Sequence, residues 1–217
     1  MTIKETKYGK FLVYEEALSI HVNNMDQNEM WEEHLKPYFD LYAKDKNIVE
    51  VGSSAGYHTV YLSTIAKHVY SFEPQLTTYE VLCSNLERNG CKNVTTHNFA
   101  LYSKNCKMKT AVPISYTSAN HSATAINLLV DKDGDIEAKT LDDMDFADIN
   151  FIKIDAQGCD LNILMGAINT IKKYKPALLF EYESEITDPL DDYIKFIKEI
   201  DYNLEGIGIR DIIATPK

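Results

Sequence analysis

The stretch that most constrains this chain is NIVEVGSSAGY, residues 47–57. A short apolar run breaks at Gly52 into a loop of small residues, and a helix-like run resumes at Tyr57. A strand, a glycine loop and a helix in this order leave backbone N–H groups at a helix N-terminus, where a polar or anionic ligand group binds. Gly52 permits the tight turn, and Gly56 permits a close approach of helix and ligand. The alternative is an ordinary β–α turn that needs glycine for its geometry alone.

The spacing of these glycines narrows the choice of ligand. Dinucleotide-binding loops read G-x-G-x-x-G, and phosphate-binding loops read G-x-x-x-x-G-K-[ST]. Here three residues separate Gly52 from Gly56, and no lysine follows, so both phosphate patterns fit weakly. An acidic strand residue, Glu50, followed by a loop with few glycines suits a ligand without a pyrophosphate. S-adenosylmethionine (SAM) is such a ligand.

Composition bounds the remaining possibilities. The 217 residues are 45% hydrophobic and 25% charged, which is typical of one soluble globular domain. A net charge of −11 argues against nucleic acid and against an anionic membrane surface as partners. No run reaches membrane-spanning length and the first residues lack the apolar core of a signal peptide, so we expect a cytoplasmic location. The four unpaired cysteines favour reduced structural thiols over a metal site.

Strands alternate with helices through most of the chain. This order predicts an α/β fold with a mostly parallel, doubly wound sheet that ends in an antiparallel strand pair at 203–207 and 211–214. The other expected elements follow the hydrophobic periodicity. The parallel strands occupy residues 47–52, 68–72, 93–98, 149–155 and 176–182, and the helices occupy residues 57–67, 77–89, 158–174 and 189–200.

Two regions depart from this alternation, although we expect residues 1–217 to form one domain. Residues 1–45 read as an N-terminal extension, with a hairpin at 8–23 that turns at Glu15-Glu16 and a helix at 29–42 that Pro37 kinks or breaks.

The second region is residues 104–140, which read as an insertion with strands near 107–114 and 137–140. Its polar span at 115–134 predicts a lid or a substrate loop, because long insertions in compact domains are commonly functional.

Polar side chains mark the carboxyl ends of the expected parallel strands. Ligands of open α/β sheets bind at these ends, near the point where the strand order reverses. A sheet core would not select acidic or amide side chains for packing. The strands end at or next to Glu50, Glu73, Asn98, Asp155 and Glu181.

Two of these strand ends suggest contacts with a nucleoside. Glu73 lies 21 positions after Gly52, a separation at which a carboxylate accepts the ribose hydroxyls; a solvated strand end is the alternative. Asn98 is a candidate for the adenine edge, with backbone groups of Phe99 or Ala100 beside it; a turn-forming Asn is the alternative.

Other candidates carry weaker signals. His58 opens the helix after the glycine loop and is a candidate for contact with ligand or substrate, whereas Trp31 is expected to be a core anchor rather than a substrate platform. Mg²⁺ is possible but not favoured, since Asp160 equally fits the first turn of a helix. Its oxygen ligands would be Asp155, Asp160, Glu181 and Glu183.

Six segments together resemble the FkbM-type methyltransferases, a branch of the SAM-dependent enzymes with a Rossmann-like class I fold. The segments are EVGSSAGYHT, YSFEP, NFAL, TLDDM, FIKIDAQG and ILMGA…I…KP…FE. The resemblance runs from about Tyr8 to Tyr182. It implies SAM as methyl donor and usually O-methylation, often of a sugar or polyketide hydroxyl, with a small molecule or glycan as acceptor.

The resemblance also implies site residues. Gly52 and Gly56 would line the methionine end of SAM, Glu73 would hold the ribose, and the turn at 98–100 would hold the adenine. The full set expected to bind SAM is Glu50, Gly52, Ser53, Ser54, Gly56, Tyr57, Glu73, Pro74, Asn98, Phe99, Ala100 and Asp155.

The sequence departs from the family pattern at three places. Glu50 stands where Asp is common, Ser53-Ser54 stand where Ala-Asn is common, and Gln157 stands where Glu is frequent. The first two exchanges keep polarity. The third removes a charge beside the expected active site and argues against a base at position 157.

Methyl transfer from a sulfonium needs alignment and removal of the hydroxyl proton, because a neutral thioether departs. Asp155 is the first candidate for the base, followed by His58 and Glu181. A cofactor-positioning contact for Asp155 and a buried ion pair for Glu181 are the alternatives. Two other functions stay open: a non-catalytic SAM-fold interaction module, and another nucleotide-cofactor enzyme such as a reductase.

Lys153 carries a structural prediction. It lies within a strand that should be apolar, and a buried cation is costly unless it is paired. The neighbouring strands carry carboxylates at a comparable depth. We therefore expect a salt bridge from Lys153 to Glu50 or Glu181.

Overall fold

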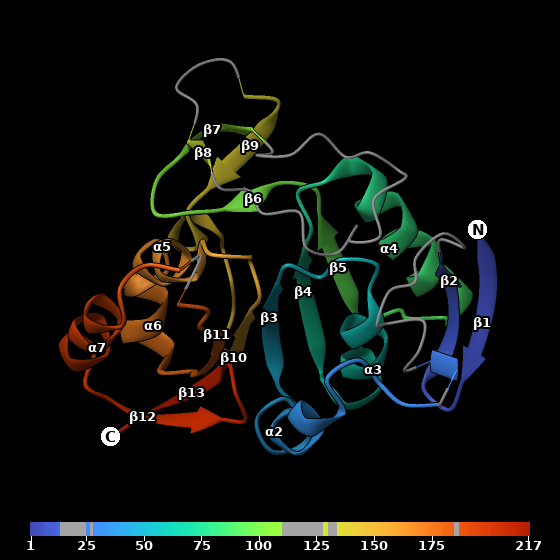
Figure 1. Cartoon of the computed structure of the whole chain (residues 1–217), viewed down its shortest axis with the longest axis horizontal. Coiled ribbons are helices and arrows are strands. Elements are labelled where there is room, and N and C mark those ends of the chain that lie inside the picture. The colour runs from blue at the N-terminus through green and yellow to red at the C-terminus, as the bar shows by residue number, and fades with distance from the viewer. Residues whose placement is uncertain (14–24, 27, 110–127, 130–133, 185–186) are drawn as a thin grey trace.

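The computed structural model describes residues 1–13, 25–26, 28–109, 128–129, 134–184 and 187–217. Its centre is a seven-stranded sheet (Figure 1). The strands from β11 to β5 run parallel, whereas β13 is antiparallel to both of its neighbours, which confirms the expected doubly wound fold. In spatial order they are β12 (Tyr202–Ile207), β13 (Asp211–Pro216), β11 (Ala177–Glu181), β10 (Ile149–Ile154), β3 (Asn47–Val51), β4 (His68–Phe72) and β5 (Val94–His97).

Helices cover both faces of this sheet. On β10, Phe151 packs on the face that holds α2 (Lys36–Tyr42) and α3 (Tyr57–Ile65), whereas the next residue, Ile152, packs on the opposite face. That second face is covered by α5 (Asp160–Met165), α6 (Ile168–Tyr174) and α7 (Leu190–Glu199). Burial on both sides explains why the parallel strands are nearly continuous apolar runs.

The strand order reverses between β3 and β10. After β3 the chain continues to β4 and, through α4 (Leu76–Arg88), to β5; it later returns to β10 on the other side of β3. The carboxyl ends of β3 and β10 lie so close that a Cβ atom at Gly52, where φ is 77°, would be 1.9 Å from the carbonyl oxygen of Asp155. Glycine is therefore required here by the approach of two strands.

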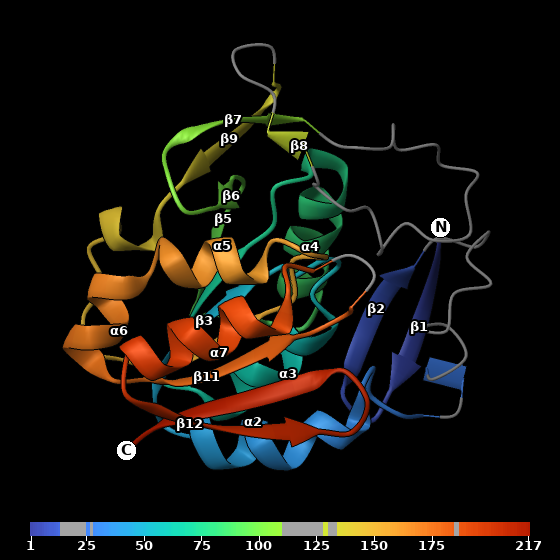
Figure 2. The ribbon, with the colours of Figure 1, turned by 60° about the vertical axis from the view of Figure 1, so that its left-hand side comes forward.

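The N-terminal hairpin lies earlier in the chain than the sequence predicts. β1 (Thr2–Thr6) pairs antiparallel with β2 (Gly9–Val13), so the turn falls at residues 7–8 and the hairpin expected at 8–23 is wrong in position. β2 lies beside α4 (Figure 2), and its apolar side chains pack against that helix. β1 is largely exposed and polar, which hid it from the hydrophobic pattern. The predicted turn at 15–16 lies outside the described residues.

Two predicted helices begin or divide differently. The helix expected at 29–42 is a short 3-10 helix, η1 (Glu33–Leu35), followed by α2. Glu32 adopts a left-handed backbone conformation (φ 53°, ψ 48°), which a right-handed helix cannot include. Pro37 lies in the first turn of α2, where no N–H is required, so it starts the helix instead of kinking it.

The helix expected at 158–174 is two helices, α5 and α6, that divide at Gly166. A Cβ atom at Gly166 would lie 2.0 Å from the carbonyl oxygen of Tyr102, so the chain passes this point in close contact with a remote segment. None of the helices in the described part of the chain is long and apolar enough to cross a bilayer.

The inserted region forms a second, smaller sheet. Its order is β6 (Ala100–Leu101), β9 (Ile136–Lys139), β7 (Cys106–Lys109) and β8 (Leu128–Leu129), and the 3-10 helix η2 (Leu141–Asp143) follows β9. The strands predicted near 107 and 137 are confirmed in their described parts. Most of the predicted lid at 115–134 lies outside the described residues, so it stays a prediction.

Candidate active site

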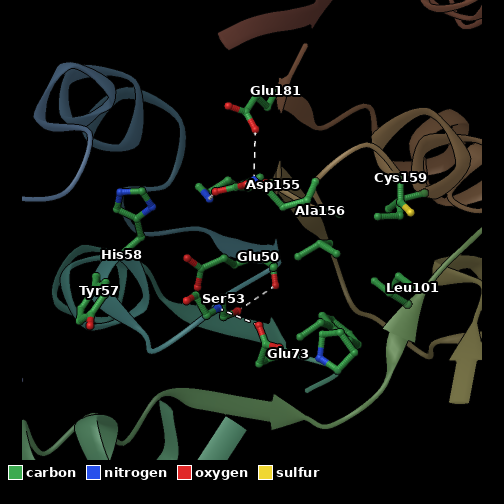
Figure 3. Close-up of a pocket in the computed structure, with 18 of the residues that line it drawn as sticks. Glu50, Ser53, Tyr57, His58, Glu73, Leu101, Asp155, Ala156, Cys159 and Glu181 are labelled. Atoms are coloured by element: carbon green, nitrogen blue, oxygen red, sulfur yellow. Dashed lines mark hydrogen bonds and ion pairs between the residues drawn. The ribbon is translucent and has the colours of Figure 1, made fainter. Parts of the chain in front are cut away.

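A cavity of about 720 Å³ opens at the carboxyl ends of β3, β4, β10 and β11, where the strand order reverses (Figure 3). Its volume lies within the range of roughly 300–1,000 Å³ that is usual for small-molecule sites. The structure brings together most of the residues that the sequence nominates. Those that line the cavity are Glu50, Gly52, Ser53, Ser54, Tyr57, His58, Glu73, Pro74, Phe99, Ala100, Asp155 and Glu181.

Two nominated residues lie outside the cavity wall formed by the described residues. The side chain of Asn98 is exposed and donates hydrogen bonds to the carbonyl oxygens of Glu73 (2.9 Å) and Pro74 (3.1 Å). Gly56 has φ 85°, and a Cβ atom there would lie 2.7 Å from Cδ1 of Leu82. Neither residue is among the described residues that line the cavity, so their expected contacts with a ligand stay predictions.

Glu73 is held at the end of β4 by backbone donors. Its Oε2 accepts the N–H of Ser54 at 3.0 Å and its Oε1 accepts the N–H of Gln75 at 2.9 Å. Burial raises the pKa of this carboxyl to about 7. Because each carboxylate oxygen has two lone pairs, Glu73 retains acceptor capacity for the hydroxyls of a ligand.

Glu50 is nearly fully buried, with 1% of its surface exposed. Thr59 donates to its Oε2 at 2.6 Å, whereas Oε1 has no hydrogen-bond partner among the described residues. Burial raises the pKa of Glu50 to about 7, although the charge of Lys153 opposes this shift. A buried acceptor without a partner is costly, so Oε1 suits a hydrogen-bond donor or a cation from a ligand.

Lys153 and Asp155 form the buried ion pair of the site. The ammonium of Lys153, 2% exposed, lies 3.3 Å from Oδ2 of Asp155, and Gln157 donates to Oδ1 at 3.2 Å. The predicted pairing of Lys153 with Glu50 or Glu181 is wrong, because Asp155 projects from the same face of the same strand two residues later. Burial acts to raise the pKa of Asp155, but Lys153 outweighs it and holds this pKa below its usual value.

His58 is engaged with the N-terminal segment. Its Nε2 lies 2.7 Å from the carbonyl oxygen of Trp31, which only accepts, so Nε2 carries the proton and donates. The same nitrogen is 3.8 Å from Oε2 of Glu32, and the ring packs edge-on against Phe39. Trp31 itself is partly exposed and lines the cavity, so the expectation of a core anchor is wrong.

Two carboxyl groups on one side of the cavity have raised pKa values. Burial and then the charge of Asp155 raise the pKa of Glu181 to about 7, against the opposing charge of Arg210. Burial raises the pKa of Glu32 to about 8, although the charge of Lys153 opposes this shift. Both groups therefore exchange protons near neutral pH.

Several lining residues carried no signal in the sequence. They come from short segments before β3 and after β12, which no local pattern joins to the glycine loop. They include Trp31, Glu32, His34, Gly208, Ile209, Arg210 and Asp211. Only their assembly in space reveals them.

The described residues contain no group of three or more His, Cys, Asp or Glu side chains that could hold a metal ion. Of the four oxygen ligands considered for Mg²⁺, Asp160 is buried at the start of α5 and is not among the described residues that line the cavity.

Comparison with known proteins connects this geometry to a family. A model described as the methyltransferase FkbM domain matches residues 50–204, which is most of the chain, although the match begins well after Tyr8. A search of curated proteins finds no match.

Solved structures share the fold. The methyltransferase FkbM from Methylobacillus flagellatus KT is 21% identical with a TM-score of 0.59; the match covers 80% of this chain but 44% of that one, so this chain spans less than half of that protein. A putative methyltransferase from Streptococcus mutans, SMU.1697c, solved in complex with SAH, is 14% identical with a TM-score of 0.52, covering 86% and 99% of the two chains. A putative rRNA methylase from Clostridium thermocellum is 10% identical with a TM-score of 0.54, covering 84% and 91%.

Proposed function

This chain belongs to the FkbM methyltransferase family, and we propose that it transfers a methyl group from SAM to a hydroxyl oxygen of a sugar, either in a glycan or in a glycosylated metabolite. We further propose that residues 1–217 work as one methyltransferase domain, with 1–45 and 104–140 as additions to its core. The observation that carries the proposal is the cavity at the reversal of strand order, with Glu50 and Glu73 buried in its wall. The putative methyltransferase from Streptococcus mutans, which shares the fold, was solved in complex with SAH.

The residues of the cavity fit SAM. Glu73, fixed by two backbone donors, would accept the ribose hydroxyls. The unpartnered Oε1 of Glu50 would accept from the ammonium of the methionine end. Phe99 and Ala100, at the start of the inserted sheet, would border the adenine. Each assignment uses a group that the fold buries and leaves with acceptor capacity or apolar surface.

Bound SAM would supply a methyl group carried on a positively charged sulfur. When the methyl group is transferred, the C–S bond breaks and the sulfur leaves as a neutral thioether. The chain's own residues then have to orient the acceptor hydroxyl and remove its proton. Asp155 stays ionised because Lys153 lowers its pKa, so it would stabilise positive charge beside the reacting groups instead of taking a proton. The Nε2 atom of His58 already donates to a carbonyl and would hold the Trp31 segment in place.

Glu181 is the base that these environments favour. Its pKa of about 7 matches proton transfer near neutral pH, and its side chain lines the cavity next to Gln157, whose Nε2 lies 3.5 Å from Oε2. As the new C–O bond forms, the hydroxyl proton would pass to this carboxylate and then to solvent. The exposed Arg210, 3.7 Å from Oε1, would keep the Glu181 side chain oriented.

Two measurements test the proposal. Calorimetry should show binding of SAM and SAH but not of NAD, because the loop carries no pyrophosphate pattern. Labelled SAM should then transfer its methyl group to a member of a panel of sugars and glycosides, with the product identified as a methyl ether by mass spectrometry. Binding of NAD in place of SAM would indicate a different cofactor enzyme. Tight binding of SAM with no transfer to any hydroxyl would favour a non-catalytic module.

A further inference from the structure

Two segments outside the family match meet at one end of the cavity. The segment from Trp31 to His34 precedes the matched region, and the turn from Gly208 to Asp211 follows it. His34 and Asp211 join them through a hydrogen bond of 2.8 Å between Nε2 and Oδ2. The wall that these two segments form therefore lies outside the residues matched to the family, whereas the residues assigned to SAM lie within residues 50–155.

This end of the cavity is strongly acidic. Carboxylates from four separate segments gather around the buried ammonium of Lys153. Arg210 is already paired with Glu183, and His34 is bonded to Asp211. Five carboxylates thus face two cationic side chains and one imidazole. The carboxylates are Glu32, Asp155, Glu181, Glu183 and Asp211.

The excess negative charge acts on the pKa of Glu32. Burial and the charges of Asp155, Asp211 and Glu181 act together to raise the pKa of Glu32 against the opposing charge of Lys153. A bound cation would relieve this repulsion, whereas a bound anion would increase it.

The same wall contains a left-handed backbone residue and apolar side chains. Glu32 keeps a left-handed backbone conformation, which costs a non-glycine residue free energy and persists where the surrounding structure imposes it. His58 donates to the carbonyl of Trp31, and Trp31 lines the cavity. Ile209, 99% exposed, lies at the tip of the opposing turn. An aromatic face beside carboxylates is suited to a ligand with a cation and hydroxyl groups.

We propose that the segments Trp31–His34 and Gly208–Asp211 form the acceptor subsite, and that this subsite takes a hydroxylated small molecule bearing an ammonium group, of the amino-sugar class. The proposal rests on the proposed function, because it assigns the other end of the cavity to SAM. The side chains of Glu32 and Asp211 bind the ammonium, and Trp31 packs against the ring of the acceptor. Phosphorylated sugars are excluded by charge.

The test compares two probes that differ at one position. Binding of D-glucosamine and of D-glucose to the SAH-saturated protein is measured by saturation-transfer NMR titration, with D-glucose 6-phosphate as the anionic probe. We expect glucosamine to bind about tenfold more tightly than glucose, the scale of one charge-assisted contact, and the phosphate to bind least. Equal or tighter binding of glucose, or no binding of glucosamine, overturns the proposal. Failure to bind SAH would count against the proposed function instead.

Variants test whether these two segments cause the preference for glucosamine over glucose. Glu32→Gln should reduce the preference for glucosamine while SAH affinity stays unchanged. Glu205→Gln, an equal change of charge at an exposed position of β12, should leave it intact. Ile209→Lys places a cation at the mouth of the cavity without disturbing packing, and should weaken glucosamine binding further. A preference that survives both Glu32→Gln and Ile209→Lys in folded protein overturns the assignment of these segments.

Discussion

Replacing Lys153 by Met isolates the buried ion pair beneath the cavity. The Lys153 ammonium is 3% exposed as a side chain and lies 3.3 Å from Asp155, whose side chain is 27% exposed. Methionine conserves most of the side-chain volume and removes the charge. Asp155 would then lose its cation in a setting that also holds the buried carboxylate of Glu50, which faces Lys153 across the β3–β10 register.

The burial of the ion pair sets the loss of stability expected for Lys153→Met. Breaking a buried pair by removing one partner typically costs about 3–5 kcal/mol, and the partial exposure of Asp155 places this case near about 3 kcal/mol. In a chain of this length, each kcal/mol of destabilisation lowers the Tm by roughly 2–4 °C, so the variant should lose about 6–12 °C. SAM affinity should fall as well, since Lys153 also holds Asp155 ionised.

A matched control decides whether burial is the cause. Lys172 pairs with Glu199 at 3.4 Å, nearly the same distance, but the two side chains are 50% and 57% exposed. Lys172→Met should cost less than about 1 kcal/mol, because exposed pairs are screened by water. Thermal unfolding followed by circular dichroism measures both variants, and adding Asp155→Asn to Lys153→Met should recover part of the loss. Equal Tm shifts for the two lysine variants would refute the reasoning.

Three further predictions follow from the same geometry. Glu73→Ala should weaken SAM binding by about 1.5–3 kcal/mol in calorimetry, the scale of a charged hydrogen bond, and an unchanged affinity in folded protein would contradict the ribose assignment. Glu50 has a pKa raised by burial to about 7, so its protonation stabilises the folded state: the free energy of unfolding should fall as the pH rises from about 5 to 8, and urea titrations of Glu50→Gln should show a smaller fall. Residues 115–134 should gain protection from hydrogen exchange when an acceptor binds; equal protection with and without a bound acceptor would argue against a lid.

The sequence predicted those features of the fold and the site that depend on short-range patterns along the chain. The apolar strands and the polar residues at their carboxyl ends follow from burial on two faces, so Glu50, Glu73, Asp155 and Glu181 could be placed at one edge in advance. The direction of a side chain was not predictable in the same way.

Asn98 illustrates that limit, because it stands at the expected strand end but donates to the loop after β4. The division between α5 and α6 at Gly166 coincides with a close approach to the carbonyl of Tyr102. The position of Glu32 depends on its own left-handed backbone conformation, far from the glycine loop in the sequence. Such contacts join distant segments and leave no periodic signal.

The hydrogen bond between His34 and Asp211 joins positions 177 residues apart, and this has a consequence for the order in which the site is built. The half of the cavity proposed for SAM needs contacts within residues 50–155, whereas the half proposed for the acceptor closes only when the turn at Gly208–Asp211 reaches η1. Contacts of long sequence separation form late, since their loop-closure entropy must be met first. A newly made chain should therefore become able to bind its cofactor before it can recognise an acceptor.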